Sequence, residues 1–132
     1  MIRKACIATI LLAVAAPASL AQAGERHARL DPNGNLDALI ARYAAANDVP
    51  ESLVRRIIHR ESRGNMRAVH NGNYGLMQIR LGTARAMGYR GSVRGLLDAE
   101  TNMRYAVKYL AGAYRVARGN PDRAVHYYAA GY

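Results

Sequence analysis

Apolar residues recur at spacings of three and four along most of the chain, and no segment keeps up an apolar-polar alternation. Spacings of three and four place side chains on one stripe of a helix, whereas alternation is the pattern of a half-buried strand. The pattern therefore predicts an all-α fold. The expected helices run from Leu36 to a stop at Asn47 and Asp48, from Pro50 to Gly64, from Thr83 to Met87, from Ser92 to Leu97, from Asp98 to Gly119 and from Asn120 to Ala130.

Residues that favour helix ends support these boundaries. The expected N-caps are Asn35, Asp98 and Asn120, and Pro121 follows the last of them in the order that suits helix entry. The intervening segment 65–74 is polar and rich in turn formers, with Asn71-Gly72 as its clearest turn. It predicts either a short hairpin or a loop.

The second helix carries a carboxyl group on its apolar side. Leu53 and Ile57 lie four residues apart on a stripe that ends at Glu61, and Val54 and Ile58 form a neighbouring row that also reaches it. Loss of hydration disfavours an ionised carboxyl and raises its pKa, which makes a proton donor for neutral pH. A glutamate at the edge of a stripe can also reach solvent or pair with an arginine. The helix alone leaves both interpretations open.

A second motif, Gly75-Leu76-Met77-Gln78-Ile79, follows the pair Glu61-Ser62 after a short loop. In this order and at this separation the two motifs resemble the paired signature of lytic transglycosylases of the soluble-lytic-transglycosylase (SLT) type, relatives of goose-type lysozyme. The resemblance spans roughly 36–132. It implies a compact lysozyme-like helical domain with the substrate cleft at the end of the Glu61 helix.

The resemblance also implies an activity. Peptidoglycan lytic transglycosylases are carbon-oxygen lyases that degrade the cell wall by cleaving the β-1,4 bond between N-acetylmuramic acid and N-acetylglucosamine. They leave 1,6-anhydromuramoyl ends and use one glutamate as acid and base. By resemblance that catalytic residue is Glu61.

The same resemblance suggests substrate-binding residues, several of which have a simpler structural explanation. Ser62 would hold the site together by hydrogen bonding, or be an ordinary polar residue at a helix end. Gly75 would supply cleft backbone, and Gln78 would contact sugar or orient Glu61. Met77 would flank the bound ring or belong to the core. Tyr128 matches the family tyrosine whose hydroxyl approaches the catalytic carboxyl.

Three positions depart from the family pattern. Ala129 stands where the family has an asparagine, and Arg80 and Leu81 replace the usual residues after Gln-Ile. The chain ends at Tyr132, where many relatives continue. We therefore expect one cleft wall to be incomplete or to be supplied by a partner.

The first residues resemble a secretory leader rather than part of the domain. A basic start is followed by the apolar run 5–16 and the small-x-small site Ala21-Gln22-Ala23, which predicts a signal peptide at 1–23 and an extended lead-in at 24–35. The run is short for a membrane span, so a retained anchor is the less favoured alternative. The one cysteine, Cys6, lies in this leader. The predicted location is the periplasm, without disulfides.

The formal net charge is +10, which predicts attraction to polyanions. For an exported protein these are peptidoglycan glycan strands with their carboxylates. No basic run or recognised motif supports nucleic-acid binding. We expect a monomer without stable membrane insertion. The small size suggests local wall opening for a secretion or conjugation apparatus.

Neither a metal nor a cofactor is expected. The histidines His27, His59, His70 and His126 show no ligand spacing with one another. Most glycosidases use two carboxylates, but Asp98, Glu100 and Asp122 lie at predicted helix starts, where capping and the helix dipole explain them. The sequence offers no clear second carboxylate.

Three alternatives remain. A lysozyme-type hydrolase would use water in place of the 6-hydroxyl group. A non-catalytic murein-binding module would keep the fold after loss of the cleft chemistry, as Ala129 and the short C-terminus suggest, although Glu61 and Gln78 are present. A basic membrane-active protein would act on lipid without glycan.

Overall fold

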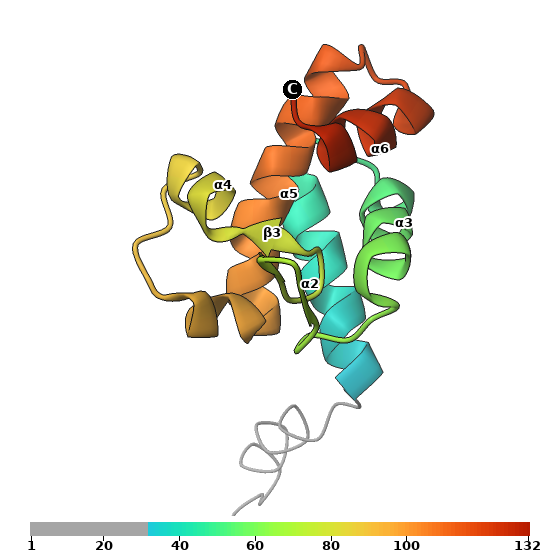
Figure 1. Cartoon of the computed structure of the whole chain (residues 1–132). Helices are drawn as coiled ribbons and strands as arrows, with labels where there is room; N and C mark the ends of the chain where they lie inside the picture. Colours follow the sequence, from blue (N-terminus) through green and yellow to red (C-terminus); the bar gives the residue numbers. More distant parts are fainter. Residues whose placement is uncertain (1–31) are drawn as a thin grey trace, which may run out of the picture. The chain divides into compact units, whose positions relative to one another are not determined.

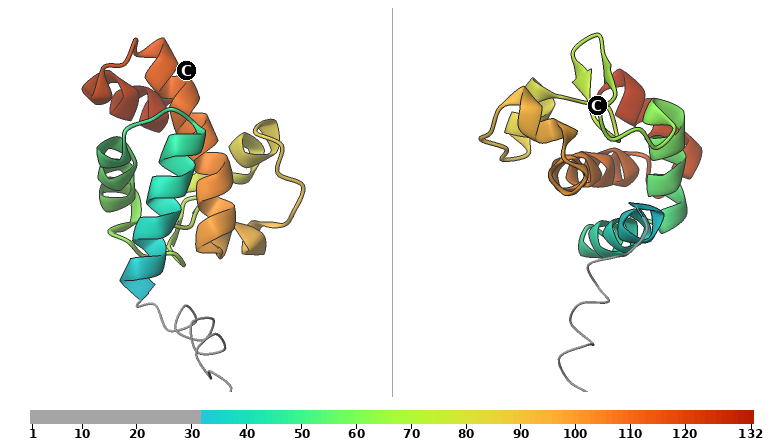
Figure 2. Two further views of the ribbon diagram at one scale, coloured as in Figure 1. Left: turned by 180° about the vertical axis from the view of Figure 1, so that it is seen from behind. Right: turned by 90° about the horizontal axis from the view of Figure 1, so that it is seen from below.

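Helix α5 (Ala99–Val116) is the longest element of the computed structural model, which describes residues 32–132 (Figure 1). Helix α6, helix α2, the 3-10 helix η2 and helix α4 all pack against it. Figure 2 shows α2 beside α5 from behind. The remaining elements are α2 (Pro32–Ala46), α3 (Glu51–Ser62), β1 (Val69–His70), β2 (Asn73–Tyr74), β3 (Ile79–Arg80), α4 (Leu81–Ala86), η2 (Val93–Leu97) and α6 (Pro121–Ala130).

The predicted all-α class is confirmed. Two of the helices begin at the capping residues that the sequence predicts. The Asp98 side chain accepts a hydrogen bond from the Thr101 backbone N–H at 2.8 Å. Asn120 caps α6 in the same way, with Arg123 as donor at 3.0 Å. These side chains satisfy backbone donors that have no partner inside the helix. Both caps are those the sequence predicts.

The start of α2 differs from the prediction. The helix begins at Pro32, so Asn35 lies within it and does not cap it, and the extended lead-in predicted through residue 35 is wrong for residues 32–35. Proline at the first helical position has a suitable φ and loses no hydrogen bond. The predicted signal peptide and residues 24–31 of the lead-in lie outside the described residues. Helix α4 likewise begins at Leu81, two residues before the predicted start.

Segment 65–74, for which the sequence allows a hairpin or a loop, contains a hairpin of β1 and β2, and β3 adds a third short strand. Asn71 and Gly72 connect β1 to β2 with φ values of 48° and 77°. A two-residue turn with positive φ at both positions matches the twist of a hairpin, and Asn-Gly is the pair that best tolerates it. The loop from Gly75 to Gln78 then joins β2 to β3.

That loop is held to α5 by the buried amide of Asn102. Its Oδ1 accepts from the Met77 backbone N–H at 3.0 Å, and its Nδ2 donates to the carbonyls of Tyr74 and Leu96 at 2.7 and 2.8 Å. Asn102 is fully buried. Gly75, with φ 74°, packs so closely that an added Cβ would lie 2.3 Å from both Asn102 Nδ2 and the Leu96 carbonyl oxygen.

The face of α3 predicted to be apolar is buried. Leu53, Val54, Ile57 and Ile58 are all in the core, whereas the arginines of this helix are exposed. Arg63 ends the helix in the left-handed conformation and donates its N–H to the His59 carbonyl. None of the helices in residues 32–132 has both the length and the apolar character needed to cross a membrane.

We predict that Asn102→Ala lowers the free energy of unfolding by about 3 kcal/mol or more, because three backbone groups of a buried site lose their partner. Denaturant unfolding provides the measurement. The matched control is Asn47→Ala, which removes one bond, from Nδ2 to the Tyr43 carbonyl at 2.8 Å, at the end of α2. The control is expected to lose about 1 kcal/mol or less. Equal losses in the two variants would refute the role given to Asn102.

Candidate active site

A cleft of about 410 Å³ opens beside the C-terminal end of α3. Its lining comes from α3, the sheet with its loop, α4, α5 and the end of α6. Twelve residues line it: Arg60, Glu61, Asn73, Gln78, Ile79, Arg80, Thr83, Tyr109, Tyr128, Ala129, Ala130 and Gly131. Four separate parts of the chain meet here, so the cleft exists only in the folded domain.

Glu61 lies in the last turn of α3 and places its carboxyl group in this cleft. Its side chain is 23% exposed. Desolvation by burial raises the pKa of Glu61, as the sequence predicts, and the positive charge of Arg60, with Nε 3.7 Å from Oε1, acts in the opposite direction. Among residues 32–132 the Glu61 carboxyl group makes no hydrogen bond. It is therefore free to exchange a proton with a ligand.

Gln78 lies opposite in the lining and has an unusual backbone. Its φ is 50°, in the left-handed region that few residues other than glycine adopt. Its side-chain Nε2 donates to the carbonyls of Ala68 and Gly75, both at 3.0 Å. The amide nitrogen thus holds the loop closed, so the side-chain oxygen is the atom left to contact a ligand. No hydrogen bond joins Gln78 to Glu61.

Tyr128 forms the wall beneath Glu61. It is 8% exposed, and its hydroxyl group donates to the Met77 carbonyl at 2.7 Å. Burial, and next the nearby Glu61 carboxylate, raise the pKa of Tyr128 well above its usual range. The hydroxyl therefore stays protonated and remains a donor. The ring of Tyr109 meets that of Tyr128 edge-on, with centroids 5.3 Å apart.

The other residues expected at the site lie behind the lining. Met77 is fully buried, with its backbone bonded to Asn102 and Tyr128. Gly75 is buried against Asn102. The Ser62 hydroxyl donates to the Ile58 carbonyl at 3.3 Å and accepts from the Gly64 N–H at 3.2 Å. Both contacts of Ser62 are local, within the last turn of α3 and the residues that follow it.

The sequence did not point to several lining residues. Asn73 and Thr83 belong to no motif, and the helical spacing of Tyr105, Tyr109 and Tyr114 predicts positions in the core or at its rim. Asn102, which does not line the cleft, resembles any polar residue of a long helix. Arg80 was visible only as a departure from the family pattern. The one signal available for Asn102 was its position among the apolar residues Met103, Ala106 and Leu110 on the buried side of α5.

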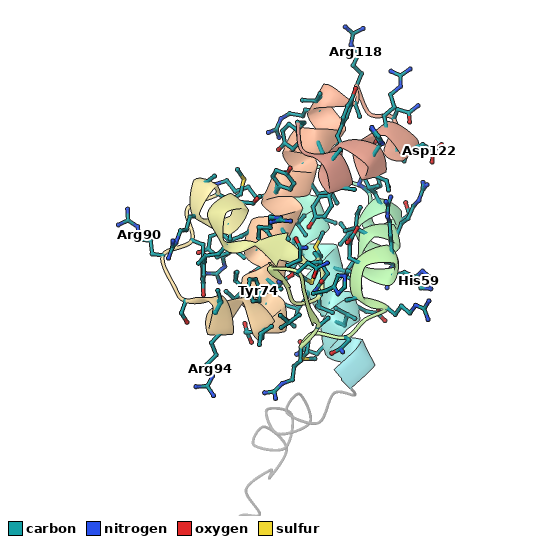
Figure 3. The ribbon with its side chains drawn as sticks, in the orientation of Figure 1. His59, Tyr74, Arg90, Arg94, Arg118 and Asp122 are labelled. Carbon is teal, nitrogen blue, oxygen red and sulfur yellow. The ribbon has the colours of Figure 1, made fainter. Side chains whose placement is uncertain are left out.

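Glu61 is the only carboxylate among the described residues that line the cleft. Glu100 pairs instead with Arg42 and Arg104, and Asp122 pairs with Arg56 at 2.6 Å on the outer surface. Figure 3 shows Asp122 and His59 pointing away from the domain interior. Nowhere in the part of the chain that the structure describes do three or more metal-ligating side chains gather.

The comparisons with known proteins concern the family and the fold. The family model described as the transglycosylase SLT domain matches residues 38–132. Among solved structures, the complex of the 70-kDa soluble lytic transglycosylase with bulgecin A is similar to this chain, with 31% sequence identity and a TM-score of 0.69. The match covers 73% of this chain and 17% of that one. The predicted lysozyme-like helical fold is confirmed.

We predict that Arg60→Gln raises the pKa of Glu61 further, because it removes the positive charge that stabilises the ionised form. The carbon-13 shift of the Glu61 carboxyl group, followed through a pH titration by NMR, measures this. Arg56→Gln is the control, since Arg56 lies one turn earlier on α3, is equally exposed and pairs with Asp122. A Glu61 titration that moves equally in both variants would show only a general charge effect.

Proposed function

The chain belongs to the transglycosylase SLT-domain family, and from that premise we propose that it is a peptidoglycan lytic transglycosylase with Glu61 as its sole acid and base. One observation carries the proposal. A partly desolvated carboxyl group stands in the cleft without a hydrogen-bond partner or second carboxylate among the described lining residues. That arrangement suits a proton donor that works alone.

The reaction would proceed in two proton transfers. Protonated Glu61 donates its proton to the oxygen that links N-acetylmuramic acid to N-acetylglucosamine, and the bond from that oxygen to C1 breaks. The substrate's own 2-acetamido group stabilises the positive charge at C1. The Glu61 carboxylate then removes the proton from the muramoyl 6-hydroxyl group while its oxygen bonds to C1. The product is a 1,6-anhydro sugar, and Glu61 is protonated again.

Proximity favours the 6-hydroxyl group over water as the nucleophile. The hydroxyl is already attached to the reacting ring, so its attack is intramolecular and needs no further binding step. A hydrolase of the two-carboxylate kind would need a second acidic side chain near the reacting carbon. Asp98, Glu100 and Asp122 are engaged at other places in the fold. This geometry favours the transglycosylase over the hydrolysing alternative.

The surroundings of Glu61 support an acid role at neutral pH. The rings of Tyr109 and Tyr128 meet edge-on in the lining, and Gln78 holds the loop closed through its two hydrogen bonds. The predicted leader at 1–23 places this chemistry, in our proposal, in the periplasm, where glycan strands are accessible. Service to a secretion or conjugation apparatus remains part of the proposal.

We predict that incubation of the chain with purified peptidoglycan releases soluble products with anhydromuramoyl ends, and that Glu61→Gln reduces this release by at least about a thousandfold. Mass spectrometry of the products is the measurement. Glu51→Gln is the matched control, because Glu51 lies on the same helix and is exposed beside Arg55. Reducing ends would indicate a hydrolase. If the wild type gave no products, the binding-module alternative would replace the proposal.

The same variant has an expected effect on stability. Because the folded-state pKa of Glu61 is raised, the native protein holds this proton more tightly than the unfolded chain does. The stability that protonated Glu61 contributes is therefore fully present at low pH, and it is lost as the pH rises through the folded-state pKa of Glu61. Glu61→Gln removes the charge that burial penalises.

We predict that Glu61→Gln unfolds at a higher temperature than the wild type at neutral pH, and that this difference shrinks below the unfolded pKa of a glutamate. Thermal unfolding followed by circular dichroism at both pH values measures it, with Glu51→Gln as the exposed control. A variant less stable than the wild type at neutral pH would contradict the desolvated state of Glu61.

A further inference from the structure

The sheet side of the cleft carries a polar pair that the proposed reaction does not use. Arg80 of β3 and Asn73 of β2 are directly opposite each other across the two antiparallel strands, and both line the cleft. Their neighbours, Tyr74 and Ile79, form the next cross-strand pair. Ile79 is buried and Tyr74 packs against the core, whereas Arg80 is exposed and Asn73 is half-buried.

The hydrogen-bonding capacity of this pair is specific. The Asn73 amide nitrogen donates to the His70 carbonyl at 3.0 Å, which leaves the side-chain oxygen of this lining residue available as an acceptor. Arg80 is exposed and forms no ion pair with any carboxylate in residues 32–132. Its guanidinium group offers a planar set of donors that suits a carboxylate. The pair therefore presents donors and an acceptor side by side.

The charges of the lining favour an anionic group at this position. Arg60, Glu61 and Arg80 are its charged residues, and Arg60 lies beside Glu61. When Glu61 is protonated to act as an acid, two positive charges remain. The N-acetyl sugars of a glycan strand carry no charge on their rings. The negative charge must therefore come from the substituent on the muramoyl lactyl group.

On the basis of the proposed function, we propose that Arg80 and Asn73 form a subsite for the stem peptide of the substrate, with Arg80 binding a peptide carboxylate and Asn73 accepting a peptide N–H. A stem peptide supplies both groups next to each other. A muramoyl residue without its peptide supplies the lactyl carboxylate alone, which would leave the Asn73 oxygen unused. The chain would therefore prefer peptide-bearing glycan to stripped glycan.

The test measures binding without turnover, by isothermal titration calorimetry with the Glu61→Gln variant of the whole chain. Three soluble tetrasaccharides serve as probes: one with tetrapeptide stems, one with the stem carboxylates amidated and one without stems. Arg80→Gln in this background is expected to weaken binding of the first probe about tenfold, as for loss of a charge-assisted hydrogen bond, and to leave the other two unchanged. Arg80 is exposed and its side chain caps no helix, so the substitution leaves the fold intact.

Arg94→Gln is the matched control, because it removes the same charge from a side chain that projects outward from η2 (Figure 3). Equal weakening by Arg80→Gln and Arg94→Gln would overturn the subsite in favour of general attraction. Weakening that persists with the stem-free probe would overturn it in favour of the lactyl carboxylate. A wild type that leaves peptidoglycan uncleaved while Arg80→Gln shows the expected selectivity would reject the proposed reaction and retain the subsite.

Discussion

The side-chain amide of Asn102 is the interaction on which the cleft depends. Three backbone groups from three places in the chain, Tyr74 of β2, Met77 of the central loop and Leu96 of η2, meet at this one residue. Buried backbone groups without partners are strongly unfavourable, so the loop can lie against α5 only where an amide supplies both a donor and an acceptor. Gly75 completes the arrangement because no larger residue fits there.

The surroundings of Glu61 follow from helix α3 and from the loop that Asn102 holds. The apolar stripe of α3 fixes how the helix rotates, and thus which way Glu61 points. The loop held by Asn102 in turn places the Met77 carbonyl where the Tyr128 hydroxyl group reaches it. Tyr128 lines the same cleft as Glu61, whose pKa is raised by burial there, so the cleft around the carboxyl group includes residues of α3, the loop and α6.

Charged side chains act in this protein both over long distances, on polyanions, and at short range, within the cleft. The net charge of +10 attracts polyanions over distances limited by salt screening and says little about which group binds where. Within the cleft, Arg60 moderates the pKa of Glu61, whereas Arg80 lies across the lining on β3. Arg60 and Arg80 are both exposed, but their surroundings differ. Arg60 adjoins the Glu61 carboxyl group, whereas Arg80 faces Asn73 across two strands.

Local sequence is enough to predict the helices apart from the starts of α2 and α4, the caps at Asp98 and Asn120, the Asn71-Gly72 turn and the apolar side on which Glu61 lies. Each of these depends on residues within one or two turns of the chain. Tertiary structure alone decided that Glu61, Gln78 and Tyr128 share a lining, while Ser62, Gly75 and Met77 lie behind it. It also decided the hydrogen bonds of Asn102 and the cross-strand pairing of Arg80 with Asn73. These contacts join residues from 6 to 28 positions apart, and local periodicity carries no information about them.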